Sequence, residues 1–152
     1  MRKTLAHPAD RAEIVARTRL IQPSSPRKWG RMSAHQMICH LADSFRVIIG
    51  EKAVSPAPGA PSKIMKWLAL QLPLRWPHGV KTRPEVGQFV AGTAPTQFEP
   101  DCKELLRLIE RFTREPRDFQ WHPHPMFGDM DDEEWMRWGY LHTDHHLRQF
   151  GV

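Results

Sequence analysis

The sequence has no long apolar run. No segment approaches the roughly 18 consecutive apolar residues that a membrane-spanning helix requires. The first residues, MRKTLAHPADRAEI, are charged and contain no apolar stretch of the kind found in secretory signals. These absences predict a cytoplasmic protein with no membrane partner.

Cysteine is also scarce. The two cysteines, Cys39 and Cys102, lie far apart in amphipathic segments and form no C-x-x-C pair. A disulfide framework is therefore excluded, and both side chains are expected to be reduced and largely buried. A role as a catalytic thiol stays open for Cys39, which adjoins His40, although neighbouring residues on a helix point in different directions.

The chain contains no concentrated block of basic residues. The net charge is +5, yet lysines and arginines are mixed with acids, as in KELLRLIERFTREPRD. Zinc-finger spacings and RNP-type aromatic motifs are missing as well. We therefore expect no nucleic-acid partner, and core packing explains the six tryptophans more simply than base stacking does.

What remains is the composition of an ordinary globular protein. The chain has 152 residues, of which 40% are hydrophobic and 26% charged, and it shows no internal repeat. This length is sufficient to enclose one hydrophobic core. We expect a single domain over residues 1–152.

Apolar residues recur at helical spacing in four segments. The expected helices span residues 9–21, 33–49, 96–114 and 131–149, with Pro100 and Asp101 at the regular start of the third. A Pro- and Ala-rich connection, a short apolar segment (KIMKWLALQL) and residues 77–95 separate the second helix from the third. The pattern predicts an all-α fold with four main helices and a long surface crossover.

Three of the expected helices begin with a capping pattern. Ser33 and Gln36 form an S-x-x-Q capping box, and a D-x-x-E pattern begins at Asp10 and again at Asp131. Gly50 is the expected C-terminal stop of the second helix.

The terminal helix is rich in histidine. His142 and His146 are four residues apart, so their side chains stand one turn apart on the same side, with about 6 Å between Cβ atoms. This spacing allows both imidazoles to reach one metal ion. His145 is rotated from them by about 100° and points elsewhere. A third ligand must come from another helix, and His40, at the inward edge of the second helix, is the best candidate.

Roles without a metal ion stay open for these histidines. A histidine within a helix is commonly a hydrogen-bonded core residue, and pairs four residues apart also occur on solvated faces. The last turn of a helix favours histidine through the helix dipole. The H-x-x-x-H spacing lacks the glutamate of H-E-x-x-H, so a zinc protease is not supported.

Further side chains are expected to orient the ligand rings through hydrogen bonds. Asp43 follows His40 by three residues and shares a helix face with it. Asp144 and Gln149 are further candidates, although capping or solvent exposure explains them equally well. His35 is about 140° away from His40 around the helix and is not expected to bind the metal. The same holds for the loop histidines His122 and His124.

Two motifs together resemble the DinB-like superfamily, also called DinB/YfiT-like proteins. They are WGRMSAHQMICHLADS, in the second helix, and EEWMRWGYLHTDHHLRQFG, in the last. The resemblance spans nearly the whole chain, is closest to an uncharacterised branch, and is weakest over residues 50–95. In that superfamily an S-x-x-x-x-x-x-H helix supplies one metal-binding histidine and a C-terminal H-x-x-x-H helix supplies two. These positions correspond here to His40, His142 and His146.

The resemblance implies a DinB-like four-helix bundle, up-down with a long crossover connection between the second and third main helices, that binds one divalent metal ion. Three imidazoles leave a coordination position open for water or substrate, as in catalytic zinc sites. Zinc or nickel is the expected ion, and iron and manganese also suit histidine ligands. Several members of the superfamily are metal-dependent transferases or isomerases that use low-molecular-weight thiols such as bacillithiol or mycothiol.

These features predict a metal-dependent enzyme of thiol S-transferase or hydrolase type that acts on a small molecule, with a low-molecular-weight thiol as a further partner. The alternative is a non-catalytic binding or interaction protein whose histidine site is structural or vestigial. Exposed tryptophans and the habit of the superfamily also lead us to expect a homodimer formed through a helix face.

Overall fold

The computed structural model describes residues 2–59, 61–72 and 75–152. Its elements are α1 (Pro8–Leu20), α2 (Ala34–Ile48), α3 (Lys63–Gln71), the 3-10 helix η1 (Pro84–Val86), α4 (Phe98–Phe112) and α5 (Asp132–Gln149). The described residues include one isolated β-bridge, between His124 and Gly128, and no strand. The predicted all-α class is confirmed. None of the described helices has the length and apolar content needed to cross a membrane.

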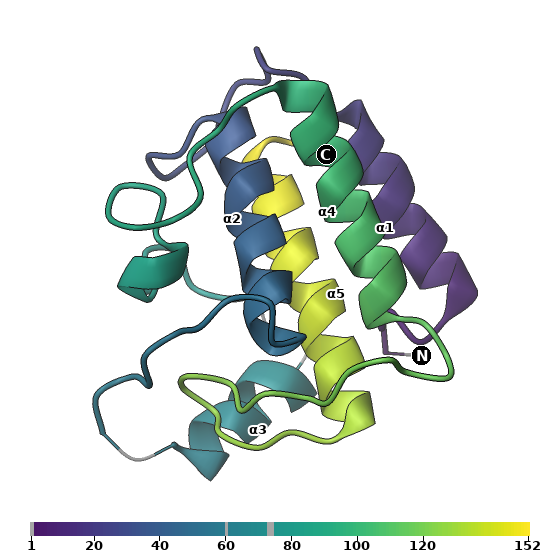
Figure 1. Ribbon diagram of the computed structural model, residues 1–152, viewed down its shortest axis with the longest axis vertical. Helices are drawn as coiled ribbons and strands as arrows, with labels where there is room; N and C mark the ends of the chain where they lie inside the picture. Colours follow the sequence, from purple (N-terminus) through teal and green to yellow (C-terminus); the bar gives the residue numbers. More distant parts are fainter. Residues whose placement is uncertain (1, 60, 73–74) are drawn as a thin grey trace.

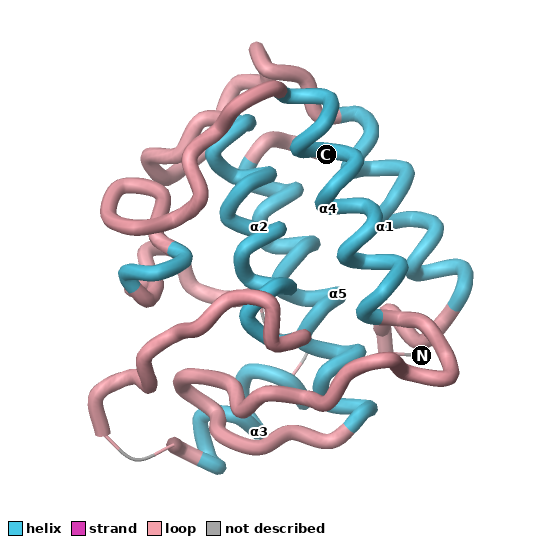
Figure 2. Tube along the Cα trace, in the orientation of Figure 1, coloured by secondary structure: helices cyan, strands magenta, loops and turns pink. Residues whose placement is uncertain are grey.

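The four longer helices lie side by side (Figure 1). α1 and α5 run in one direction, and α2 and α4 run in the other. α2 packs on α4 and α5, while α1 packs on the same two helices from the opposite side. Because α2 and α4 are parallel, the chain must return along the whole length of the helices between them, and the crossover over residues 49–97 does this (Figure 2).

Helix starts follow the capping patterns in two cases. Ser33 accepts a hydrogen bond from the backbone of Gln36, and the Gln36 side chain accepts one from the backbone of Ser33, so α2 begins where expected. Asp131 and Glu134 form the same reciprocal box at α5. Gly50 has a φ of 81°, the left-handed conformation that ends helices.

Two details of the predicted helices are wrong. Asp10 does not cap α1; it lies inside the first turn, where it accepts from the Thr4 backbone at 3.0 Å and pairs with Lys3 at 2.9 Å. The regular part of α4 begins at Phe98, before the expected start at Pro100. Pro100 itself lies within the first turn, as predicted, where its missing N–H costs no hydrogen bond.

The core lies between the four long helices and is centred on α2. Twelve of the fifteen residues of α2 are buried, and Phe45 packs against Phe112 and Trp138 with ring centroids 5.0 and 6.0 Å apart. Trp135, at the first turn of α5, is fully buried. Both cysteines are free; Cys39 is buried and Cys102 is half-buried. The large aromatic side chains of Phe45, Phe112, Trp135 and Trp138 fill the end of the core at which α5 begins.

α3 lies across that end, beside the loop that leads into α5 (Figure 1). It packs on α5 through Leu70, which is buried, but leaves an apolar face outward. The exposed residues of this α3 face are Ile64, Met65, Trp67 and Leu68.

Candidate metal centre

The antiparallel packing of α2 and α5 brings three histidines together. His40 lies near the middle of α2, and His142 and His146 lie in the last two turns of α5. Because the two helices run in opposite directions, the C-terminal half of α5 faces the N-terminal half of α2. One nitrogen from each ring lies within 4.8 Å of the other two. The ring centroids are 4.7–5.5 Å apart.

Two of the rings are oriented by hydrogen bonds through Nδ1. Nδ1 of His40 lies 2.8 Å from the carbonyl oxygen of Val86, in η1. Nδ1 of His146 lies 3.1 Å from Oε1 of Gln149, whose amide nitrogen donates to the carbonyl of Trp29 at 2.8 Å. Carbonyl oxygens only accept, so both Nδ1 atoms carry the proton. The lone pair of each ring is then on Nε2, where it is free to bind a metal ion.

The third ring, of His142, is held by packing. It stacks on Trp138 with ring centroids 4.8 Å apart and planes 28° from parallel. Its Nδ1 is buried and has no hydrogen-bond partner among the described residues. Packing on Trp138, rather than a hydrogen bond at Nδ1, therefore sets the position of this ring.

The electrostatics keep all three imidazoles neutral. Burial lowers the pKa of His40, and it lowers the pKa values of His142 and His146 well below the usual value. The other two imidazoles lower the pKa of His142 further, since nearby positive charges would repel one another. Neutral imidazole is the form that binds metal, so the site is ready for a cation at neutral pH.

Such a donor set fits a divalent transition metal. Imidazole nitrogens suit zinc, nickel, copper and iron, and three of them leave at least one coordination position open. The residues present can therefore hold a metal ion.

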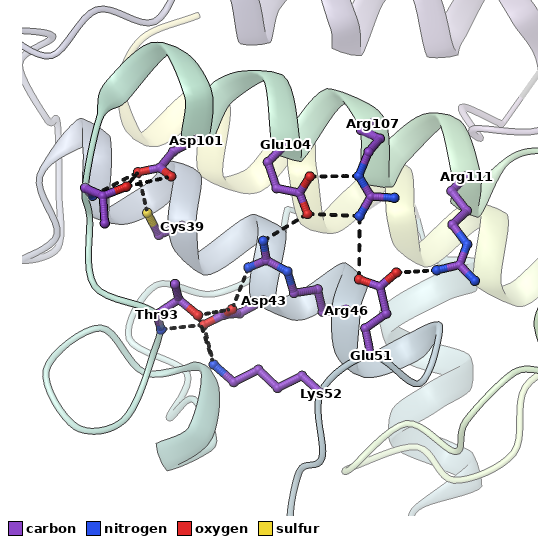
Figure 3. Close-up of polar contacts among 11 residues, drawn as sticks. Cys39, Asp43, Arg46, Glu51, Lys52, Thr93, Asp101, Glu104, Arg107 and Arg111 are labelled. Carbon is purple, nitrogen blue, oxygen red and sulfur yellow. Dashed lines mark hydrogen bonds and ion pairs between the residues drawn. The ribbon is translucent and has the colours of Figure 1, made fainter.

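Asp43 does not orient His40, contrary to the sequence prediction. Its carboxylate is fully buried and accepts from Lys52 Nζ at 2.7 Å, from Arg46 at 3.1 Å, and from the backbone and hydroxyl of Thr93 at 2.7 Å each (Figure 3). Burial raises the pKa of Asp43, but these donors outweigh it and hold the pKa below its usual value. The Asp43 carboxylate therefore links the crossover to α2 and does not orient the His40 ring.

Asp144 is also directed elsewhere, because it pairs with Arg17 at 2.8 Å and with Arg148 at 2.5 Å. Of the three candidates, Gln149 alone contacts a ligand ring. Sequence reasoning missed Val86, since a backbone carbonyl carries no side-chain signal.

A second cluster surrounds Asp101, at the start of α4. Its Oδ2 lies 2.7 Å from Nε2 of His35 and accepts from the backbone of Thr96 at 3.0 Å. The same oxygen lies 3.7 Å from Sγ of Cys39 (Figure 3). Its three possible metal-binding atoms also lie close together. Burial and the Asp101 charge raise the pKa of Cys39 to about 12, so it stays a thiol at neutral pH. This argues against a nucleophilic Cys39.

The remaining histidines fall outside the three-histidine centre. His124, in the loop before α5, accepts from the backbone of Met126 and Phe127 through Nδ1, and burial lowers its pKa to about 4. His145 points away from the centre, as its helical position predicted, and lines a neighbouring cavity.

This cavity has a volume of about 340 Å³, and two of its lining residues neighbour the three histidines, which do not line it themselves. Trp76 and His145, in its wall, have ring centroids 6.1 Å from His142 and 5.2 Å from His146. A larger cavity of about 720 Å³ lies between α1 and α4, and no residue of α2 or α5 lines it. The smaller cavity is therefore the nearer of the two to the centre.

Comparison with known proteins gives a family and no function. The family model described as "Protein of unknown function (DUF1569)" matches residues 1–151. No curated protein and no solved structure matches the chain significantly. Because the match covers nearly the whole sequence, the chain belongs to the DUF1569 family.

Proposed function

We propose that this protein is a DinB/YfiT-like metal-dependent enzyme in which His40, His142 and His146 bind one divalent ion. The observation that carries the proposal is the convergence of the three rings, with one nitrogen of each within 4.8 Å of the other two. Zinc and nickel are the ions we expect first. The parallel α2 and α4 and the long crossover agree with the bundle that the sequence motifs imply.

The reaction class we favour is transfer to or from a low-molecular-weight thiol, with hydrolysis as the second choice. A bound divalent ion would supply Lewis acidity and lower the pKa of a coordinated thiol or water. The protein would contribute the neutral imidazoles, the hydrogen bonds that fix their orientation, and the Trp138 ring that excludes water from one side of His142.

Metal binding is tested with untagged protein. We expect elemental analysis to find close to one divalent ion per chain. The zinc affinity of the protein and its variants is measured by competitive titration. Alanine at His40, His142 or His146 should weaken zinc binding more than about 100-fold, beyond the usual cost of losing a residue that only orients a ligand. Control variants, which should leave the affinity unchanged, are His35→Ala, His124→Ala and His145→Ala.

Circular dichroism of each variant separates loss of a ligand from loss of the fold. If wild-type protein stays metal-free and ignores added zinc, nickel and manganese, the metal site is refuted. If His145→Ala proves as damaging as His142→Ala while His146→Ala is harmless, the assignment of ligands on α5 is refuted.

Catalytic and structural roles are distinguished by the open coordination position. Cobalt-substituted protein should develop a sulfur-to-cobalt charge-transfer band when free cysteine is added, because a thiolate can then enter the coordination sphere. An unchanged spectrum at millimolar thiol would contradict the thiol-transferase proposal and favour the non-catalytic alternative.

A further inference from the structure

The cavity beside the three-histidine centre has a distinct charge and shape. Its walls come from three parts of the chain: the loop after α1 (Lys28, Trp29), the crossover (Arg75, Trp76, His78), and the C-terminal end of the chain. The last part contributes His145, Arg148, Gly151 and Val152. We call this cavity the anion pocket.

The described residues lining the anion pocket include three permanent cations and no acidic side chain. Arg148 is neutralised by Asp144, at 2.5 Å. Lys28 and Arg75 are exposed, and no ion pair joins either of them to another described residue. The main-chain oxygen of Val152 accepts a hydrogen bond from Arg17 at 2.9 Å. Two cations at the rim are thus available to an incoming ligand.

The same pocket offers flat aromatic walls. Trp29 and His78 stack with ring centroids 4.1 Å apart and planes 9° from parallel, which fixes both rings. Trp76 is fixed by a hydrogen bond from its Nε1 to the carbonyl of Ala69 at 2.9 Å. Rigid aromatic walls with a few charged groups at fixed places are typical of small-molecule sites, and about 340 Å³ is within the size range of such sites.

The position of the pocket links it to the metal centre. His145 is next to His146 in the sequence, and its ring lies 5.2 Å from that ring. Trp76 faces His142 at 6.1 Å. The Trp76 and His145 rings therefore form the boundary that the pocket shares with the three-histidine centre.

From this arrangement we infer that the protein acts on a small anionic molecule with a planar portion, whose carboxylate or phosphate binds Lys28 and Arg75. This inference rests on the proposed function, because the metal centre is the site of reaction. It adds the chemical class of the substrate, an organic anion, and the residues that select it. Neutral molecules of the same shape bind less tightly because they gain nothing from the two cations.

Phenyl phosphate and benzoate are suitable probes, with phenol as the neutral equivalent. Their binding to zinc-loaded and zinc-free protein is measured by ligand-observed NMR titration at low ionic strength. We expect at least one of the anions to bind about 10-fold or more tightly than phenol, since charged hydrogen bonds are the strong ones. The tighter of the two anions identifies the preferred anionic group.

A pair of matched double variants locates the binding. Lys28→Gln/Arg75→Gln should weaken binding of the anion about 10- to 100-fold and leave zinc affinity and helicity unchanged. Arg11→Gln/Lys103→Gln removes the same charge from the cavity between α1 and α4 and should have no effect on the anion.

The inference is overturned if neither anion binds more tightly than phenol, or if the two double variants behave alike. Zinc titration of the same samples distinguishes this failure from failure of the proposed function. A protein that binds zinc but not the anions refutes the anion pocket alone, whereas a protein that binds no zinc refutes the metal centre.

Discussion

At the scale of single residues, the site depends on which nitrogen of each imidazole carries the proton. Val86 and Gln149 fix this for His40 and His146 by accepting from Nδ1. Without such an acceptor, neither the tautomer nor the orientation of an imidazole is fixed before the metal ion binds. A side chain that hydrogen-bonds a metal-binding histidine, but does not itself bind the metal ion, is therefore expected to affect metal affinity measurably.

Gln149 provides a direct test of this point. Gln149→Leu removes the acceptor for His146 Nδ1 and the donor to the Trp29 carbonyl, and should weaken zinc binding about 10- to 100-fold. Gln149→Glu keeps an acceptor at the same place and should restore most of the affinity. Competitive zinc titration of both variants gives the comparison, and equal loss in both would show that the contact with Trp29, not with His146, matters.

The i,i+4 pair on α5 could be read from the sequence because helical geometry alone puts His142 and His146 on one side. His40 required the added assumption that α2 and α5 pack together. The role of Asp43 was misjudged because sharing a helix face with His40 does not make a contact when stronger partners are available. Lys52 and Thr93 lie 9 and 50 residues away, and no local pattern announces them.

At the scale of elements, the crossover contributes directly to the metal centre. η1 supplies the carbonyl that orients His40, and Thr93 is hydrogen-bonded to the buried Asp43. The same face of α2 is fastened to α4 by Arg46, which donates to Glu104 at 3.0 Å (Figure 3). Loss of Asp43 would loosen the segment that carries Val86.

Asp43→Ala should destabilise the protein by about 3 kcal/mol at pH 7, because Lys52, Arg46 and Thr93 lose a buried partner. The pKa of Asp43 is lower in the folded state, so its contribution is complete above the unfolded pKa of about 3.9 and disappears as the pH falls through the folded value. The difference in unfolding free energy between wild type and Asp43→Ala should therefore shrink below about pH 4.

Urea unfolding between pH 3 and pH 7 measures this difference. Asp118→Ala is the matched control, because Asp118 also pairs with an arginine, Arg111 at 3.0 Å, but from an exposed position. It should change the stability little at any pH. A difference for Asp43→Ala that stays constant down to pH 3 would contradict the assigned pKa direction.

The helices with complete capping boxes were predicted to within a residue at their starts, since cap and helix are neighbours in the sequence. α1 was misread because Asp10 and Glu13 have the same spacing as a cap while serving Thr4 and Lys3. The crossover could be predicted only as a connection. Its fold is set by contacts with α2 and by η1, a three-residue helix too short to produce a periodic signal.

At the scale of the whole molecule, the α3 face bears on the expected homodimer. Of the six tryptophans only Trp67 is exposed, at 56%, so the exposed tryptophans from which association was predicted reduce to one. Residues 52–84 around it contain six basic residues and no acidic one. If two copies associated through the α3 face, they would bury this apolar surface. The basic residues around it on the two copies would repel one another and oppose the association.

We therefore expect a weak homodimer whose association strengthens as salt screens the repulsion. Sedimentation equilibrium at high micromolar concentration should show dimer in wild type and less in Ile64→Ser/Trp67→Ser. Leu20→Ser removes an equally exposed apolar side chain from α1 and should leave the dimer intact. Monomer at all salt concentrations would exclude the homodimer.

The metal site also has a consequence for the stability of the whole molecule. The large side chains of the core, Phe45, Phe112 and Trp135, pack together without the three histidines, so the metal-free protein should be fully helical. A metal ion would join the middle of α2 to the end of α5, and it binds the folded state alone. Binding then stabilises the protein by mass action, whatever the reaction it serves.

Zinc at about 100 times its dissociation constant should add about 2.7 kcal/mol to the unfolding free energy. For a chain of this length that corresponds to a rise in Tm of about 5–10 °C, reversed by chelator. His40→Ala/His146→Ala leaves a single imidazole and should unfold at the same temperature with and without zinc. A metal-free wild type without helicity would show that the ion is required for folding itself. An equal shift in the double variant would place the zinc elsewhere, with the Asp101 cluster the next site to examine.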